Sequence, residues 1–276
     1  EVKKNTYNEM IAYLAEVYEI KAENPTFKEW FYTWLDYKET ITTSSKTIRR
    51  HEQHFNRYFL SPQSKLLNIK LRDIDKFILE AECNKIVKNF NITKNEWGNL
   101  KTVLNGMFQL AFEKGIIKEN TLKLITIGIR FRQINKQPSE KMVLQTGEYE
   151  ALLEYLDEEF KEKQSIKYIA VKFGLFTGLR IGEIIALKWE DLDLENRIMH
   201  VQREEVGDDY RDENRKWHGA RKIVDHTKGY KDRYLDILPQ AIEVLNLASS
   251  FTNEGFVFRD DSGKITTNKY NHVLED

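Results

Sequence analysis

A Thr-Gly dipeptide followed closely by an arginine and a glutamate is the part of this sequence best suited to chemistry. Thr177 and Gly178 end one predicted helix, and Arg180 falls in the first turn of the next. A guanidinium has five N–H donors in fixed directions, and together with the backbone amides at a helix start it forms a strong phosphate-binding site. Glu183 follows one turn later and can hold the arginine. A solvated arginine–glutamate pair on a surface helix has the same spacing, so these residues alone leave both interpretations open.

A second basic segment reads His-Thr-Lys-Gly-Tyr-Lys-Asp-Arg over residues 226–233. Lys228 stands before a glycine, and the flanking residues alternate as in β-strands, which predicts a lysine at a hairpin tip. A basic hairpin tip is usually only solvated, so these residues alone give Lys228 no particular role.

The segment from Thr177 to Asp193 resembles the first arginine motif of the tyrosine recombinase, or phage integrase, family. The family pattern is Thr-Gly-Leu-Arg-x-x-Glu, followed by Leu-x-x-x-Asp-(Ile/Leu)-Asp. Thr177 through Glu183 fill the first part, and Leu187 with Asp191 to Asp193 fill the second. This motif is specific, because many positions match at fixed spacing.

The resemblance implies phosphoryl transfer without a metal or any other cofactor. A tyrosine hydroxyl would attack the scissile phosphate to form a 3′-phosphotyrosine, and a freed 5′-hydroxyl would later attack that linkage. Arg180 would stabilise charge on the non-bridging oxygens. The second segment resembles the family's Lys-Gly-x-Lys-x-Arg hairpin, so Lys228 would protonate the leaving 5′-oxygen. Lys231 and Arg233 would contact the DNA backbone or support the hairpin.

The resemblance also implies the partners of the chain. These are a double-stranded DNA attachment or crossover site and further copies of the chain, because the family works as a homo-tetramer on DNA. The expected function is integration and excision of a mobile element, carried by a phage or a transposon, in the cytoplasm of a bacterium. The DNA sequence of the site cannot be read from these residues.

The family also needs a His-x-x-Arg motif, a further His or Trp, and a nucleophilic tyrosine, which we expect beyond residue 276. Tyr270 and His272 are late candidates, but no arginine stands three residues after His272, and Tyr270 comes too early. We interpret both as packing or surface residues of a last helix. The residues up to 276 should therefore not complete strand cleavage alone.

Two hypotheses follow, together with a weaker third. The chain belongs either to a recombinase whose nucleophile lies further on, or to a DNA-binding remnant of the same fold that has lost its chemistry. In the third, an unrelated helical enzyme carries the motif by coincidence. Salt-dependent binding to duplex DNA would be absent in that case.

Helical periodicity dominates residues 1–120. Capping boxes at Thr6, Thr26 and Thr93 begin three helices, and another is expected from about Ser44 to Phe59. Asp73 is predicted to cap a helix with an inner face made by Ile74, Phe77, Ile78 and Ala81. These elements predict a helical domain with an aromatic core. The family resemblance implies that this domain is the core-binding domain, which binds DNA.

Residues 121–145 have no sustained period and contain Gly128 and Pro138, which predicts a partly extended linker. Residues 146–276 then form the second domain, beginning with helices near 146–160, 165–176 and 180–187. Strands 197–203, 220–226 and 233–238 are predicted to share one antiparallel sheet, with a hairpin loop over 204–219. The expected fold class is mainly α with a small antiparallel β-sheet. The second domain would be the mixed α/β catalytic domain, incomplete at its C-terminus.

Composition excludes several classes of protein. The chain is 41% hydrophobic and 32% charged, which is typical of a globular protein. No apolar run approaches the roughly 20 residues that a membrane helix needs, so no membrane partner is expected. Cys83 is the one cysteine, which excludes a disulfide framework and fits a reducing compartment.

The net charge of −1 hides an asymmetry between the two halves. Residues 1–136 hold 23 Lys and Arg against 16 Asp and Glu, whereas the remainder holds 20 against 28. A basic first half favours binding to a polyanion, although ordinary solvated helix faces give the same count. Basic residues that recur on predicted helices and in the linker could follow DNA phosphates. These are Lys46, Arg49, Arg50, Arg57, Lys94, Lys101, Arg130 and Arg132.

Overall fold

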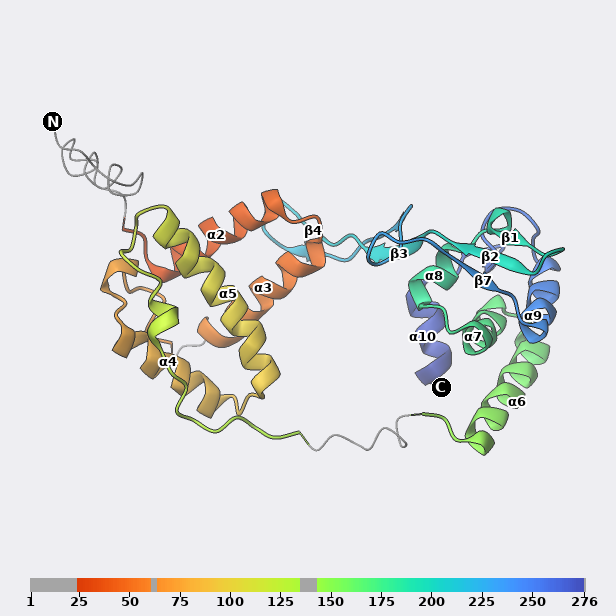
Figure 1. Cartoon of the computed structure of the whole chain (residues 1–276), viewed down its shortest axis with the longest axis horizontal. Helices are drawn as coiled ribbons and strands as arrows, with labels where there is room; N and C mark the ends of the chain where they lie inside the picture. Colours follow the sequence, from red (N-terminus) through yellow and green to blue (C-terminus); the bar gives the residue numbers. More distant parts are fainter. Residues whose placement is uncertain (1–23, 61–63, 135–142, 276) are drawn as a thin grey trace. The chain divides into compact units, whose positions relative to one another are not determined.

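The structure, a computed structural model, describes residues 24–60, 64–134 and 143–275. The chain divides into two compact units, Glu1–Lys136 and Gln137–Asp276, drawn from red to yellow-green and from green to blue in Figure 1. The division falls within the segment predicted to be the linker. No helix in the described ranges is long and apolar enough to cross a membrane.

The first unit is helical, as its periodicity predicts. Thr26 and Thr93 each accept a hydrogen bond from the backbone of the glutamate three residues on, and that glutamate accepts one in return, so both predicted capping boxes are confirmed. Thr6 lies outside the described residues. The described part of the unit forms four α-helices and two short 3-10 helices: α2 (Phe27–Ile41), α3 (Ser45–Phe59), η1 (Leu71–Asp73), α4 (Lys76–Asn89), α5 (Lys94–Glu113) and η2 (Thr121–Leu124).

Aromatic rings fill the interior between α2, α3 and α5. The rings of Phe31 and Phe55 stack with their centroids 3.6 Å apart, and Phe27 packs on both Phe55 and Phe59. The indole N–H of Trp30 donates to a backbone carbonyl of α5, so its polar atom is satisfied inside the core. The predicted aromatic core is therefore confirmed.

The predicted start of α4 was wrong. Asp75, not Asp73, is the N-cap, and its carboxylate accepts a hydrogen bond from the backbone N–H of Ile78 at 2.8 Å. The inner face consequently consists of Leu79, Cys83, Ile86 and Val87. Phe77 is 76% exposed, whereas the prediction placed it inside. Two aspartates two residues apart can both cap, and the apolar stripe further along the helix selects the second.

Much of the segment predicted as a linker packs onto the first unit. Leu122 in η2 is buried, and η2 lies against α4 and α5. The carboxamide of Asn84 accepts hydrogen bonds from the backbone N–H groups of Gly128 and Ile129. Arg132 extends the attachment, because its backbone N–H donates to the carbonyl of Ile92. Pro138 lies outside the described residues.

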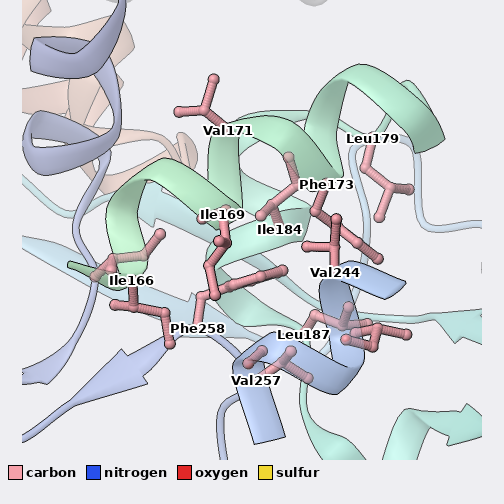
Figure 2. Close-up of a cluster of buried hydrophobic side chains, with 14 of the residues drawn as sticks. Ile166, Ile169, Val171, Phe173, Leu179, Ile184, Leu187, Val244, Val257 and Phe258 are labelled. Carbon is pink, nitrogen blue, oxygen red and sulfur yellow. The ribbon is translucent and has the colours of Figure 1, made fainter. Parts of the chain in front are cut away.

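The second unit is built around α7, which is apolar on most of its circumference. Figure 2 shows Ile166, Ile169 and Phe173 of this helix among the side chains of the core, with Val244 and Phe258 from later segments. Helices α6, α9 and α10 pack on α7. The helices of the unit's described residues are α6 (Thr146–Lys163), α7 (Ile166–Thr177), α8 (Ile181–Ala186), η4 (Trp189–Asp191), α9 (Pro239–Ser249) and α10 (Thr267–Glu275).

The strands form one three-stranded antiparallel sheet and several two-stranded ribbons. The sheet has the order β1 (Leu192–Asp193), β2 (Ile198–Val201) and β7 (Arg233–Asp236). The ribbons pair β3 (Glu204–Gly207) with β6 (Arg221–Val224), β4 (Tyr210–Arg211) with β5 (Trp217–His218), and β8 (Arg259–Asp260) with β9 (Gly263–Lys264).

The fold class is confirmed as mainly α with small antiparallel sheets, but one strand pairing was predicted wrongly. Strand β6 does not join β2 and β7; it pairs with β3, inside the segment predicted to be a loop. The polar composition of residues 204–219 conceals the strands, because β3 has mostly polar side chains and lacks the apolar alternation that marks a strand in a sequence. Strand β1 takes the third place in the sheet.

Candidate functional site

Arg180 is the N-cap of α8, with extended backbone angles, one residue before the helical turn in which we expected it. Gly178 ends α7 at a φ of 64°, a left-handed conformation that glycine adopts without strain. The predicted break between the two helices at Thr177 and Gly178 is therefore confirmed. Helix α8 has only six residues, so the guanidinium of Arg180 rather than a helix terminus must provide most of any phosphate binding.

Glu183 is buried, with a side chain that is 0% exposed, and it binds two arginines. Its Oε1 lies 2.9 Å from Nη1 of Arg180, and its Oε2 accepts the backbone N–H of Arg180 at 3.0 Å. Arg233, at the start of β7, donates from Nη1 to Oε1 at 3.0 Å and from Nη2 to Oε2 at 2.7 Å. One carboxylate thus binds the guanidinium groups of two arginines, one of them fifty residues further along the chain than Glu183.

The charges at this cluster remain fixed at neutral pH. Burial alone would raise the pKa of the Glu183 carboxyl, but hydrogen bonds from Arg233 and Arg180 outweigh burial and lower that pKa below its ordinary value. The same hydrogen bonds to Glu183 raise the pKa of Arg233. Because two guanidinium groups share one carboxylate, the cluster has a net positive charge. The side chain of Arg180 is 57% exposed and can meet an anion from solvent.

Lys228 lies exposed in the turn between β6 and β7. The adjacent Thr227 is buried, and its hydroxyl donates to the backbone carbonyl of Lys231 at 2.6 Å. The backbone N–H of Tyr230 donates to the carbonyl of Thr227, and Gly229 has a φ of 103°. The buried threonine therefore closes the turn that presents the lysine. The role of Thr227 was not predicted from the sequence, although this threonine stands directly before Lys228.

The strands on both sides of this turn are attached to α8. Strand β7 is attached through Arg233 and Glu183. Strand β6 pairs with β3, and β3 packs on α8 so closely that a Cβ on Gly182 would lie 2.8 Å from the carbonyl oxygen of Glu205. Glu205 is itself buried and accepts hydrogen bonds from Lys264 and Thr267. The arginine motif and the lysine turn are thus parts of one connected arrangement.

The aspartate of the second half of the motif has a structural role. Asp191 is buried and accepts hydrogen bonds from Arg203 at 2.5 Å, from Gln202 at 2.6 Å and from the backbone of Lys188. These contacts connect η4 to the residues that follow β2. Asp193 accepts hydrogen bonds from Asn196 within the turn between β1 and β2.

The two late candidates lie on α10. Tyr270 is 5% exposed, and its hydroxyl would lie 2.3 Å from a Cβ added to Gly174 of α7. Burial raises its pKa to about 12. His272 is largely exposed and lies 3.3 Å from Glu275. These positions are those of a packing residue and a surface residue, as we interpreted them from the sequence.

Two of the basic residues proposed to contact DNA come together in the first unit. Arg57 of α3 and Arg132 both lie near the carboxylate of Glu96, at 3.9 and 3.4 Å. Lys94 is the first residue of α5, the helix that carries Glu96. The guanidinium of Arg57 also lies over the ring of Tyr58. The other residues of the set are distributed over α3, α5 and the segment after η2; those classed as exposed are Lys46, Arg50, Lys101 and Arg130. Arg49 is half-buried on α3.

Comparison with known proteins places the second unit in a family. Residues 142–275 match the model of the phage integrase family. A Lactococcus lactis protein described as "Prophage ps2 probable integrase" is 24% identical over 272 residues, which cover 90% of this chain and 63% of that protein. A XerC-like tyrosine recombinase of Caldanaerobacter subterraneus is 26% identical over 191 residues, which cover 66% of this chain and 44% of that protein. The chain therefore spans less than two thirds of the length of these relatives.

Solved structures share the fold at low sequence identity. The Tn1549 transposon integrase in complex with transposon right end DNA has a TM-score of 0.65 at 16% identity, covering 91% of this chain and 78% of that one. A lambda integrase tetramer bound to a Holliday junction has a TM-score of 0.64 at 12% identity, covering 99% and 70%. The second unit, over residues 142–275, is therefore a domain of the phage integrase family.

Proposed function

We propose that this chain is part of a site-specific recombinase that cleaves and rejoins DNA through a 3′-phosphotyrosine intermediate, for integration and excision of a mobile element. The observation that carries the proposal is the cluster of Arg180, Glu183 and Arg233 beside the turn that presents Lys228. The cluster offers an exposed guanidinium held by a carboxylate that stays charged. Preorganised donors of this kind stabilise the charge that develops on a phosphate in phosphoryl transfer.

Each residue of the site has a distinct role in this proposal. Arg180 binds a non-bridging oxygen of the scissile phosphate. Lys228 donates a proton to the leaving 5′-oxygen, which its exposed position at a closed turn permits. The nucleophile is a tyrosine other than Tyr270, because Tyr270 is buried against α7 and burial raises its pKa.

The first unit is proposed to bind the duplex through its basic residues. Lys46, Arg50 and Arg57 are spaced four and seven residues apart on α3, and Lys94 and Lys101 are seven apart on α5, so each set follows one helix face. Glu96 partly neutralises Arg57 and Arg132, which should weaken their contribution. Since a lambda integrase in this fold forms a tetramer on a Holliday junction, assembly of this protein on DNA as a tetramer is also proposed.

Capture of the covalent intermediate tests the proposal. The full-length protein is incubated with a nicked duplex spanning the attachment site beside its own gene, and protein–DNA adducts are resolved on a denaturing gel. We expect an adduct at the 3′ side of the break, unchanged by EDTA because no metal takes part. Cleavage that needs a metal and leaves no adduct would contradict the proposal and indicate a nuclease. Tight binding without cleavage would favour the alternative, a DNA-binding remnant of the same fold.

A further inference from the structure

Arg233 has more contact with the buried Glu183 than Arg180 itself has through its side chain. Both terminal nitrogens of Arg233 donate to the carboxylate, one to each oxygen, whereas Arg180 donates one side-chain hydrogen bond to Oε1. We infer that Arg233 is a positioning residue, which acts on the phosphate-binding Arg180 through Glu183 and does not itself contact DNA. The inference rests on the proposed function and replaces a DNA-binding role for Arg233.

The physical argument concerns how a buried carboxylate satisfies its charge. An unpaired carboxylate in the interior is costly, so Glu183 must keep a strong cationic partner. Arg233 supplies that partner in a two-point geometry, which fixes the plane of the carboxylate. Arg180 can then remain 57% exposed, with most of its donors directed elsewhere. Without Arg233, we expect the guanidinium of Arg180 to turn further onto Glu183 and lose donors that a phosphate would use.

The same contact also determines where the lysine turn lies. Arg233 is the first residue of β7 and follows Lys228 by five positions. Its ion pair attaches the end of the turn to α8, the helix that begins after Arg180. Arg233 therefore fixes the position of both proposed catalytic residues, although the sequence places it among the basic residues of a solvated hairpin.

The test is a double-mutant cycle on single-turnover DNA cleavage by the full-length protein, combining Arg233→Ala with Glu183→Gln. Arg233→Ala should lower the cleavage rate by roughly 100-fold, because a displacement of about 1 Å in a catalytic group has that effect. In a Glu183→Gln background, Arg233→Ala should lower the cleavage rate only slightly further, since the carboxylate through which Arg233 acts is already absent. Arg233→Lys keeps the charge without the two-point geometry, so its cleavage rate should lie between those of the wild type and Arg233→Ala.

DNA binding separates this role from a direct DNA contact. Arg233→Ala should leave the Kd for duplex DNA and its salt dependence unchanged. Loss of a phosphate contact would instead reduce the log–log salt slope by about 1 and would overturn the inference. Lys172→Met removes an ion pair to Asp157 that connects α7 to α6, and it should not change the cleavage rate. Thermal unfolding confirms that each variant is folded at the assay temperature.

The remaining outcomes are also decisive. If Arg233→Ala lowers the rate equally in the wild-type and Glu183→Gln backgrounds, Arg233 acts independently of Glu183 and the inference is wrong. If Arg233→Ala cleaves at the wild-type rate, the inference fails while the proposed function stands. Failure of the wild-type protein to cleave would contradict the proposed function instead.

Discussion

Glu183 connects stability to catalysis at the scale of a single residue. Its carboxylate is buried and binds two guanidinium groups, so its ionised form is stabilised by folding. The arginine motif predicted that Glu183 would hold Arg180, because the two residues are one helical turn apart. The second partner, Arg233, could not be predicted, since a contact across fifty residues depends on how β7 packs on α8.

Replacement of Glu183 by glutamine should make the protein less stable in a way that depends on pH. The pKa of this carboxyl is lower in the folded protein, so its contribution is present above the unfolded value, about 4.3, and lost as pH falls through the folded value. At pH 7, Glu183→Gln should lower the free energy of unfolding by about 2 kcal/mol. Urea unfolding from pH 7 to pH 3 measures this difference.

The difference between wild type and Glu183→Gln should shrink only in the acid range. As a control, Glu243→Gln changes an exposed glutamate on α9 and should leave the unfolding free energy nearly constant at every pH. A Glu183→Gln difference that stays the same down to pH 3 would show that the carboxylate charge does not contribute to stability.

At the scale of elements, α8 depends on a close approach to β3. A Cβ on Gly182 would lie 2.8 Å from the backbone oxygen of Glu205, and backbone atoms cannot move aside cheaply. Gly182→Ala should therefore destabilise the second unit by about 1–3 kcal/mol and reduce DNA cleavage, because α8 holds the arginine site. Urea unfolding followed by tryptophan fluorescence measures the first effect.

Gly98 offers a matched substitution in the other unit. It lies inside α5 with nothing within 4 Å of an added Cβ, so Gly98→Ala should stabilise the first unit by up to about 1 kcal/mol. The two glycines thus predict opposite signs for the same chemical change. Stabilisation by Gly182→Ala would mean that α8 and β3 are not packed as described.

The elements also show what a sequence can and cannot predict. Helices with a capping residue and an apolar stripe, such as those beginning after Thr26 and Thr93, could be located from local signals. The predicted start of α4 was wrong, because Asp73 and Asp75 can both act as the N-cap and the structure uses Asp75. The pairing of β3 with β6 was not predicted, because it is made by backbone hydrogen bonds and the polar sequence of these strands gives little sign of it.

At the scale of the whole molecule, the two units differ in net charge, and we propose that they also differ in function. The first unit, residues 1–136, is basic by seven charges, whereas the second carries an acid excess of eight. Duplex affinity should therefore come from many phosphate contacts, most of them on the first unit, and fall steeply with salt. A single arginine in the second unit should contribute little to that affinity.

Binding and cleavage measured together on one variant of the full-length protein, Arg180→Ala, separate a role in the chemical step from a role in DNA binding. We predict that its Kd for the attachment-site duplex stays within a few-fold of the wild-type value, while single-turnover cleavage is abolished. This result would place Arg180 in the chemical step on a DNA phosphate. If binding is lost while cleavage per bound complex is unchanged, Arg180 is only a DNA-binding residue and takes no part in the chemical step.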